Sequence, residues 1–159
     1  MTDKDFINIA IDISEKAPFP YGAIVVKDGR IIGRSDAIVK EHALKLYTHS
    51  EYRAIQNAVE NDWGRGDRYG GLYGGMEGCT IYTSCQPCMA CMGIILYKQI
   101  KKVVYAATLE DSSKYIVKEV GADLATLADL AGYNIEIVKE LERKRAVEVL
   151  KNWKNRNDS

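Results

Sequence analysis

The sequence has no long apolar run of the kind that forms a membrane helix. No stretch approaches the about 18 consecutive apolar residues that such a helix needs, and residues 1–6 show no basic segment followed by an apolar one. A secretory leader would show that pattern. We therefore expect a soluble protein of the cytoplasm with no membrane partner.

An excess of charge of either sign is also absent. The chain has 22 Lys+Arg and 22 Asp+Glu, so its formal net charge is zero. A protein with no net field has little general attraction for a phosphate backbone, which makes a nucleic-acid partner the less favoured interpretation. The basic residues near the C-terminus, such as those at 143–145, alternate with Glu140, Glu142 and Glu148. This mixture is typical of a solvated helix face.

Cysteine is absent from most of the chain. The four cysteines are Cys79, Cys85, Cys88 and Cys91, all within one short segment. In a cytoplasmic protein such crowding favours metal binding or catalysis over a set of disulfides. Taken alone, the Cys88–Cys91 spacing also suits a redox dithiol, half of a structural zinc site, or two thiols packed as small apolar groups.

The length and the pattern of apolar residues predict one domain that spans residues 1–159. With 47% apolar residues the chain can bury a substantial core. Helices are expected at about 3–16, 48–59, 87–97, 111–120, 124–130 and 141–153. Strands are expected at 23–26, 31–32, 79–83, 103–107 and 134–138.

This order predicts the α/β class: a three-layer α/β/α fold around a five-stranded mixed sheet. A helix between the last two strands makes those two strands parallel. Asp28 and Gly29 favour a tight hairpin turn between the first two strands. Thr48 is expected to cap the second helix, with Glu51 completing a capping box.

Two short motifs carry the chemistry, His49-Ser-Glu51 and Pro87-Cys88-Met-Ala-Cys91. Residues three apart in a helix share a face, and a helix N-terminus favours thiolates over thiols. Two thiolates and one neutral imidazole give three zinc ligands and leave one position for water, which marks a catalytic zinc site. Glu51 is then placed to move protons as a general acid and base.

These motifs resemble the signature of the cytidine deaminase-like zinc deaminases, His-x-Glu followed by Pro-Cys-x-x-Cys. The branch most similar in appearance contains the bacterial guanine deaminases and related nucleobase deaminases. The segment 82–88 reads Tyr-Thr-Ser-Cys-Gln-Pro-Cys and resembles their Tyr-Thr-Ser-Cys-Glu-Pro-Cys, with Gln86 in place of the usual Glu.

The resemblance implies a role for each residue of the site. His49, Cys88 and Cys91 hold one zinc ion per chain, and Glu51 shuttles protons. The backbone N–H of Ser50 binds a ring carbonyl. Asp111 accepts hydrogen bonds from a ring N–H and an amino group, the donor pattern that guanine offers. The resemblance also implies a homodimer.

One departure from the family pattern leaves the substrate open. The family usually has an Asn at the end of the second strand that grips the base, where this chain has Ala37 or Ile38. Asp36 is the nearest polar residue, and we therefore include it as a candidate substrate contact.

Three functions remain open from the sequence. The favoured one is a hydrolase that releases ammonia from a small heterocycle: guanine, a related aminopurine, a pterin or a triazine. The second is a tRNA adenosine deaminase or a cytosine or cytidine deaminase. The third is a zinc-stabilised domain without turnover.

Two features of the site also have more than one interpretation. Cys85 is the obvious fourth ligand if the zinc is structural. Trp63, Tyr69 and Tyr73 either form an aromatic lid or pack against a partner subunit, and packing is favoured.

Overall fold

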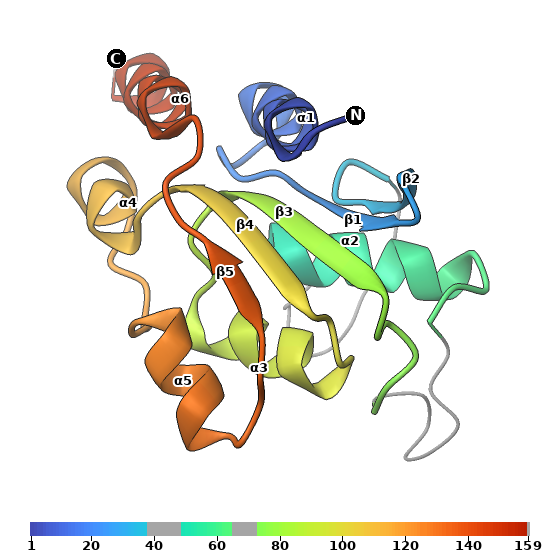
Figure 1. The fold of residues 1–159 in the computed structure, drawn as a ribbon. Helices are drawn as coiled ribbons and strands as arrows, with labels where there is room; N and C mark the ends of the chain where they lie inside the picture. Colours follow the sequence, from blue (N-terminus) through green and yellow to red (C-terminus); the bar gives the residue numbers. More distant parts are fainter. Residues whose placement is uncertain (38–48, 65–72, 159) are drawn as a thin grey trace.

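The computed structural model describes residues 1–37, 49–64 and 73–158. In these ranges the chain forms a five-stranded sheet and six helices (Figure 1). The elements in chain order are α1 (Asp3–Lys16), β1 (Ala23–Lys27), β2 (Arg30–Arg34), α2 (Ser50–Glu60), β3 (Cys79–Cys85), α3 (Met89–Tyr97), β4 (Lys102–Ala107), α4 (Leu109–Tyr115), α5 (Leu124–Leu130), β5 (Glu136–Val138) and α6 (Arg143–Asn157).

The strands are ordered β2-β1-β3-β4-β5, with β3 in the centre. β1 is antiparallel to both β2 and β3, whereas β3–β4 and β4–β5 are parallel. Parallel neighbours need a crossover connection, which α3 provides for the first pair and α4 with α5 for the second. The predicted mixed sheet and its parallel last pair are confirmed.

Three layers follow from the alternation of apolar residues along the buried strands. In β1, Ala23 and Val25 belong to the core beneath α2, α3 and α5. Ile24 and Val26 belong to the core beneath α1 and α6. Figure 1 shows these two groups of helices on opposite faces of the sheet. The predicted α/β/α architecture is confirmed.

The β1–β2 hairpin turns as its sequence predicts. Asp28 and Gly29 have φ angles of 48° and 73°, and Lys27 pairs with Arg30 on either side of them. Two consecutive left-handed residues form the hairpin turn whose twist matches that of the strands.

The predicted capping box at α2 is wrong. The N-cap is His49, which makes no side-chain capping hydrogen bond, and Thr48 lies outside the described residues. Glu51 is therefore the second helical residue and not the third, the position from which a capping box closes. Its carboxylate instead accepts hydrogen bonds from Ser50 and Thr83.

Three other helix starts also differ from the sequence prediction, and one of them is α6, which begins at Arg143 and not at residue 141. α3 begins at Met89 with Cys88 as its N-cap, so Pro87 precedes the helix. α4 begins at Leu109, because Thr108 caps it and Asp111 completes a capping box, and it ends at Tyr115. No helix continues to residue 120.

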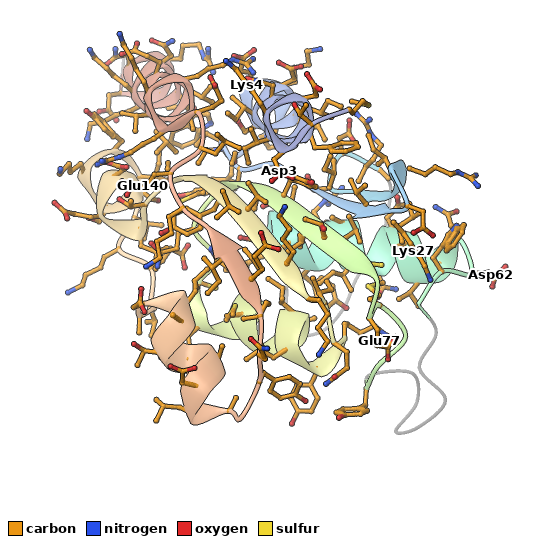
Figure 2. The ribbon with its side chains drawn as sticks, viewed as in Figure 1. Asp3, Lys4, Lys27, Asp62, Glu77 and Glu140 are labelled. Atoms are coloured by element: carbon orange, nitrogen blue, oxygen red, sulfur yellow. The ribbon has the colours of Figure 1, made fainter. Side chains whose placement is uncertain are left out.

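The N-terminal helix is tied to the sheet through one carboxylate. Asp3, labelled in Figure 2, accepts hydrogen bonds from the Tyr82 hydroxyl at 2.7 Å and from the Lys102 ammonium at 2.7 Å. These bonds join α1 to β3 and β4. Across the described ranges we find no helix with the length and apolarity to cross a membrane.

Candidate active site

The structure brings the three predicted metal ligands together. One ligand atom each from His49, Cys88 and Cys91 lies within 4.8 Å of the other two. His49 Nδ1 is 3.6 Å from Cys88 Sγ. His49 caps α2 and Cys88 caps α3. The cluster therefore forms where the N-termini of two helices meet.

This donor set fits a zinc ion. Zinc bonds of about 2.0–2.1 Å to nitrogen and about 2.3 Å to sulfur in a tetrahedron place neighbouring ligand atoms about 3.6–3.8 Å apart. The 3.6 Å separation of the His49 and Cys88 atoms matches this spacing. One imidazole and two thiols make three protein ligands, the number found in catalytic zinc sites.

The three side chains of the cluster hold their protons unequally. Hydrogen bonds from Cys91 and His49 lower the pKa of Cys88 to about 4. The Cys88 hydrogen bond raises the pKa of His49 to about 9, and the same sulfur and burial raise the pKa of Cys91. At neutral pH Cys88 is therefore a thiolate, and a metal ion competes with protons for the other two ligands.

Cys85 is not part of the cluster. Its Sγ lies 3.6 Å from the carbonyl oxygen of Thr108, and burial raises its pKa. The ligand set identified in the described residues comprises His49, Cys88 and Cys91. This arrangement gives no support to Cys85 as a fourth ligand.

Glu51 lies beside the cluster, and its side chain is almost fully buried at 7% exposure. Its Oε2 accepts a hydrogen bond from Ser50 Oγ at 3.1 Å and its Oε1 accepts one from Thr83 Oγ1 at 3.2 Å. Burial raises its pKa. A carboxyl group with a raised pKa is suited to both taking up and releasing a proton.

Thr83 was not predicted from the sequence. It is fully buried on β3, and its Oγ1 is also 2.9 Å from the carbonyl oxygen of Cys85. Strand alternation was the available signal, since Thr83 lies two residues after Ile81, which faces the α2 side of the sheet. A polar residue at that position points toward the start of α2.

The cluster opens into a cavity of about 500 Å³, here called the site cavity. His49, Ser50 and Glu51 line it together with an aromatic wall formed by Phe19, Tyr21 and Trp153. This volume is in the range of small-molecule sites.

Trp153, from the last helix, shapes that wall. Its ring stacks on Phe19 with centroids 5.8 Å apart and an angle of 28° between the planes. Its Nε1 donates to the carbonyl oxygen of Pro18 at 2.9 Å. This role of Trp153 was not predicted from the sequence.

Two of the three aromatic residues proposed as a lid, Trp63 and Tyr73, do not line the site cavity. Trp63 packs against the core on the α2 side of the sheet and does not line the site cavity. Tyr73 is 40% exposed and is also absent from the cavity lining. Tyr69 lies outside the described residues. Trp63 therefore packs within its own chain.

Asp111 does not line the site cavity. Its carboxylate accepts hydrogen bonds from Arg143 Nε at 2.8 Å and Nη2 at 2.9 Å, and from the backbone N–H of Thr108 at 3.0 Å. Arg143 lowers the pKa of Asp111 to about 2. Because Asp111 closes the capping box of α4 and faces α6, its predicted contact with substrate is not favoured by the geometry.

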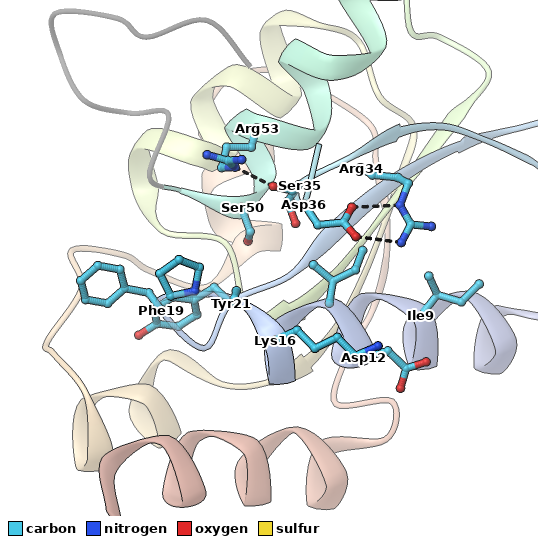
Figure 3. Close-up of a pocket in the computed structure, with 13 residues that line it drawn as sticks. Ile9, Asp12, Lys16, Phe19, Tyr21, Arg34, Ser35, Asp36, Ser50 and Arg53 are labelled. Atoms are coloured by element: carbon cyan, nitrogen blue, oxygen red, sulfur yellow. Dashed lines mark hydrogen bonds and ion pairs between the residues drawn. The ribbon is translucent and has the colours of Figure 1, made fainter. Parts of the chain in front are cut away.

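Asp36 lies in a neighbouring cavity of about 570 Å³ (Figure 3). Figure 3 shows its carboxylate paired with Arg34, whose Nε is 2.9 Å away. The two cavities share Phe19, Tyr21 and Ser50. Of the three predicted substrate contacts, only Ser50 therefore lies in the site cavity.

Comparison with known families agrees with the geometry of the cluster. Residues 1–107 match the family described as the cytidine and deoxycytidylate deaminase zinc-binding region. The chain belongs to this family. The matched segment contains all three ligands and Glu51, so the chain carries a zinc-binding deaminase domain.

Two relatives within this family differ in their named substrates. The chain is 33% identical over 109 residues to the guanine deaminase of Bacillus subtilis, covering 64% of this chain and 62% of that protein. It is 36% identical over 94 residues to the tRNA-specific adenosine deaminase of Aquifex aeolicus, covering 58% of this chain and 55% of that protein. The alignments thus span less than two thirds of either relative.

Among solved structures, the chain is similar to a guanine deaminase from Nitrosomonas europaea. The TM-score is 0.70 at 17% identity, over 97% of this chain and 85% of that one. This likeness extends the shared fold past residue 107, through α4, α5 and α6.

Proposed function

We propose that this protein is a zinc-dependent hydrolytic deaminase that releases ammonia from the exocyclic amino group of a nucleobase-type ring. Its substrate is guanine or a related aminopurine, pterin or triazine. The observation that carries the proposal is the position of Glu51, buried beside the His49–Cys88–Cys91 cluster in a cavity with an aromatic wall.

The metal has a defined place in this proposal. His49, Cys88 and Cys91 hold it, and bound zinc supplies a Lewis acid that brings the pKa of a water molecule to about 7. The reaction adds water at the ring carbon, breaks the carbon–nitrogen bond to the amino group and leaves a carbonyl.

Glu51 moves the protons in this scheme. It takes a proton from the attacking water and delivers it to the ring nitrogen, and it then takes the proton of the added hydroxyl and delivers it to the departing amine, as the carbonyl forms. Ser50 and Thr83 each donate a hydrogen bond to its carboxylate, and these bonds fix its direction. Positioned proton transfer of this kind contributes about 10²–10⁴-fold to rate.

The start of α2 supplies a further donor. Ser50 is the first residue of the helix, so its backbone N–H has no partner within the helix. Since Ser50 lines the site cavity, this N–H is available to a ring carbonyl. The flat faces of Phe19 and Trp153 favour stacking with a heterocycle.

A tRNA adenosine deaminase is the second candidate, because a tRNA-specific relative is as similar as the guanine deaminase. Phosphate contacts would make such binding weaken steeply with added salt. A gel shift with tRNA at low and moderate salt distinguishes the two. The net charge of zero favours the small-molecule substrate.

Following the resemblance, we also propose that the protein is a cytoplasmic homodimer. Sedimentation equilibrium of the zinc-loaded protein tests the dimer. A mass equal to one chain of 17.8 kDa contradicts it.

The direct test of function is ammonia release by zinc-loaded protein from guanine, adenine, cytosine, a pterin, ammeline and their available nucleosides. Turnover of one ring, lost in Glu51→Ala protein with the same zinc content, supports the proposal. Absence of turnover across the panel, in protein shown to hold one zinc ion per chain, contradicts it.

A further inference from the structure

Gln86 stands where the related deaminases usually have a Glu. It follows the last residue of β3 by one position and precedes Cys88 by two. The residue is half-buried, and it lines the site cavity. Its backbone N–H donates to the carbonyl oxygen of Ala107, the last residue of β4, at 2.8 Å. The side-chain amide of Gln86 therefore starts from a backbone that the sheet holds in place.

That amide uses both its donor and its acceptor. Its Nε2 donates to the carbonyl oxygen of Ala122 at 3.1 Å, and its Oε1 accepts from the backbone N–H of Leu109 at 3.4 Å. Leu109 is the first residue of α4, so its N–H has no partner within the helix. Ala122 directly precedes the N-cap of α5. Gln86 thus joins the start of α4 to the chain just before α5.

The 117–122 segment between these two helices is held by few bonds. In the described part of the chain it makes two hydrogen bonds with other residues. One is the bond from Gln86 to the carbonyl oxygen of Ala122. The other runs from the backbone N–H of Met89, the first residue of α3, to the carbonyl oxygen of Val120 at 2.8 Å. Both bonds attach the segment to the beginning of α3.

The backbone between these two bonds passes close to a metal ligand. A Cβ atom on Gly121 would lie 2.2 Å from Leu109 Cδ1 and 3.7 Å from the Cα of Cys88. A larger residue at position 121 would therefore push against Leu109. The 117–122 segment thus lies directly against the start of α3, where Cys88 is the N-cap.

The same segment carries part of the wall of the site cavity. Val117 lines the cavity, next to Ile116 at the end of α4. Val117 and Val120 are both exposed, so the burial of their apolar surface contributes little to holding the segment. The hydrogen bonds from Gln86 and Met89 therefore fix the position of this wall relative to the metal ligands.

A carboxylate at position 86 lacks the donor that this arrangement needs. An amide offers a donor and an acceptor, whereas an ionised carboxylate only accepts. Glu in place of Gln86 could still accept from the N–H of Leu109. Its other oxygen would then face the carbonyl oxygen of Ala122, and two acceptors repel each other. The amide of Gln86 thus matches the carbonyl group that this chain presents to it.

We propose that Gln86 is a positioning residue of this deaminase: its amide fastens the 117–122 segment to the start of α3 beside Cys88, and so sets the wall of the site cavity that a substrate ring contacts. The inference rests on the proposed function and deepens it, because it names a residue that governs substrate affinity through the segment that it holds.

The test compares the parent with Gln86→Glu, a residue that related enzymes accommodate at this position. KM and kcat are measured for each ring of the panel that is turned over. Amide exchange in the zinc-loaded protein is followed by NMR at Met89 and Leu109. Gln99→Glu is the matched control, because Gln99 also donates to a carbonyl oxygen, that of Leu96 at 3.3 Å, and does not line the site cavity.

In Gln86→Glu we expect the Met89 amide to exchange at least about 5-fold faster, because its acceptor moves away with the segment. The Leu109 amide stays within about 2-fold of the parent, since a carboxylate still accepts from it. KM rises by about 3- to 10-fold, the effect of one lost hydrogen bond, while kcat stays within about 2-fold. Zinc content is unchanged.

Two further variants sharpen the result. Gln86→Met has neither a donor nor an acceptor, so both the Met89 and the Leu109 amides exchange faster and KM rises as in Gln86→Glu. Gln99→Glu keeps the exchange rates and the KM of the parent. A loss of stability alone would lower the midpoint of urea unfolding without separating KM from kcat.

The inference is contradicted if Gln86→Glu leaves the exchange of the Met89 amide unchanged, if it lowers kcat and leaves KM as it is, or if Gln99→Glu raises KM equally. Failure of the proposed function is a separate result, seen as the absence of ammonia release from every ring by the parent. The exchange rate at Met89 then decides the inference alone: faster exchange in Gln86→Glu supports it, and an unchanged rate contradicts it.

Discussion

The two sides of the site cavity are built in different ways. The metal side comes from two short motifs, each at the start of a helix, and Glu51 follows His49 by two residues. The substrate side comes from three distant parts of the chain: Phe19 and Tyr21 before β1, Val117 after α4, and Trp153 near the C-terminus. The residues that we expect to carry the reaction are thus close together in the sequence, whereas those on the substrate side come together only through tertiary packing.

This difference predicts that variants on the metal side abolish turnover, whereas those on the substrate side change affinity or leave turnover intact. The largest effect is expected for Cys91→Ala. Removing one of three protein ligands leaves two, which hold zinc weakly, so zinc content falls to near zero after dialysis against a chelator. Ammonia release falls to the rate without protein.

Metal analysis and an activity assay check this prediction. Cys79→Ala is the control, because Cys79 is a buried thiol of β3 outside the cluster. If Cys91→Ala keeps a full zinc complement, the three-ligand assignment is wrong.

A smaller effect is expected for Trp153→Leu on the substrate side. Loss of ring stacking costs about 0.5–1.5 kcal/mol, or about 2- to 12-fold in affinity. We expect KM to rise by that factor while zinc content stays unchanged. Steady-state kinetics measures it, with Trp63→Phe as the control that leaves KM as it is. An unchanged KM in Trp153→Leu would mean that the wall does not contact the ring.

The smallest effect on turnover is expected for Asp111→Asn, which acts on stability. The charge lost from the buried Asp111 carboxylate costs about 1 kcal/mol in the free energy of unfolding at neutral pH, since Arg143 is half-exposed and keeps its other acidic partner, Glu140. Urea unfolding measures this cost. Turnover of the folded variant stays within about 3-fold of the parent, against the role in substrate binding that the sequence predicted.

The same variant has a defined pH dependence. The pKa of Asp111 is about 2 in the folded chain against an ordinary 3.8, so its contribution is present above about pH 4 and lost as the pH falls toward 2. The stability difference between parent and Asp111→Asn therefore shrinks as the pH falls from about 5, roughly one unit above the ordinary pKa, to about 2, the pKa in the folded chain. A difference that grows on acidification contradicts the assignment.

Much of the fold followed from local patterns. The hairpin at Asp28–Gly29, helix α5 and the parallel β4–β5 pair all appeared as predicted. The start of α2 did not, because Thr is a preferred N-cap residue and His is not, so the observed cap at His49 depends on tertiary contacts that the local sequence does not show. In this structure the cap is His49, whose ring lies against Cys88.

The site residues also fall into two groups, those that local sequence predicts and those that it does not. The ligands and Glu51 were predicted because metal chemistry demands particular side chains at short spacing. Thr83 and Trp153 were missed because nothing in their neighbouring residues indicates which distant group they meet. Asp111 was placed at the substrate through an alignment to the family, whereas Arg143, 32 residues later, engages it in this chain.

The most direct test of this account is Glu51→Gln, measured for zinc content, ring affinity and ammonia release in the same preparation. We expect one zinc ion per chain, ring affinity within about 3-fold of the parent, and ammonia release reduced by about 10²–10⁴-fold. Ammonia release within about 3-fold of the parent, with zinc retained, would contradict the assignment of proton transfer to Glu51.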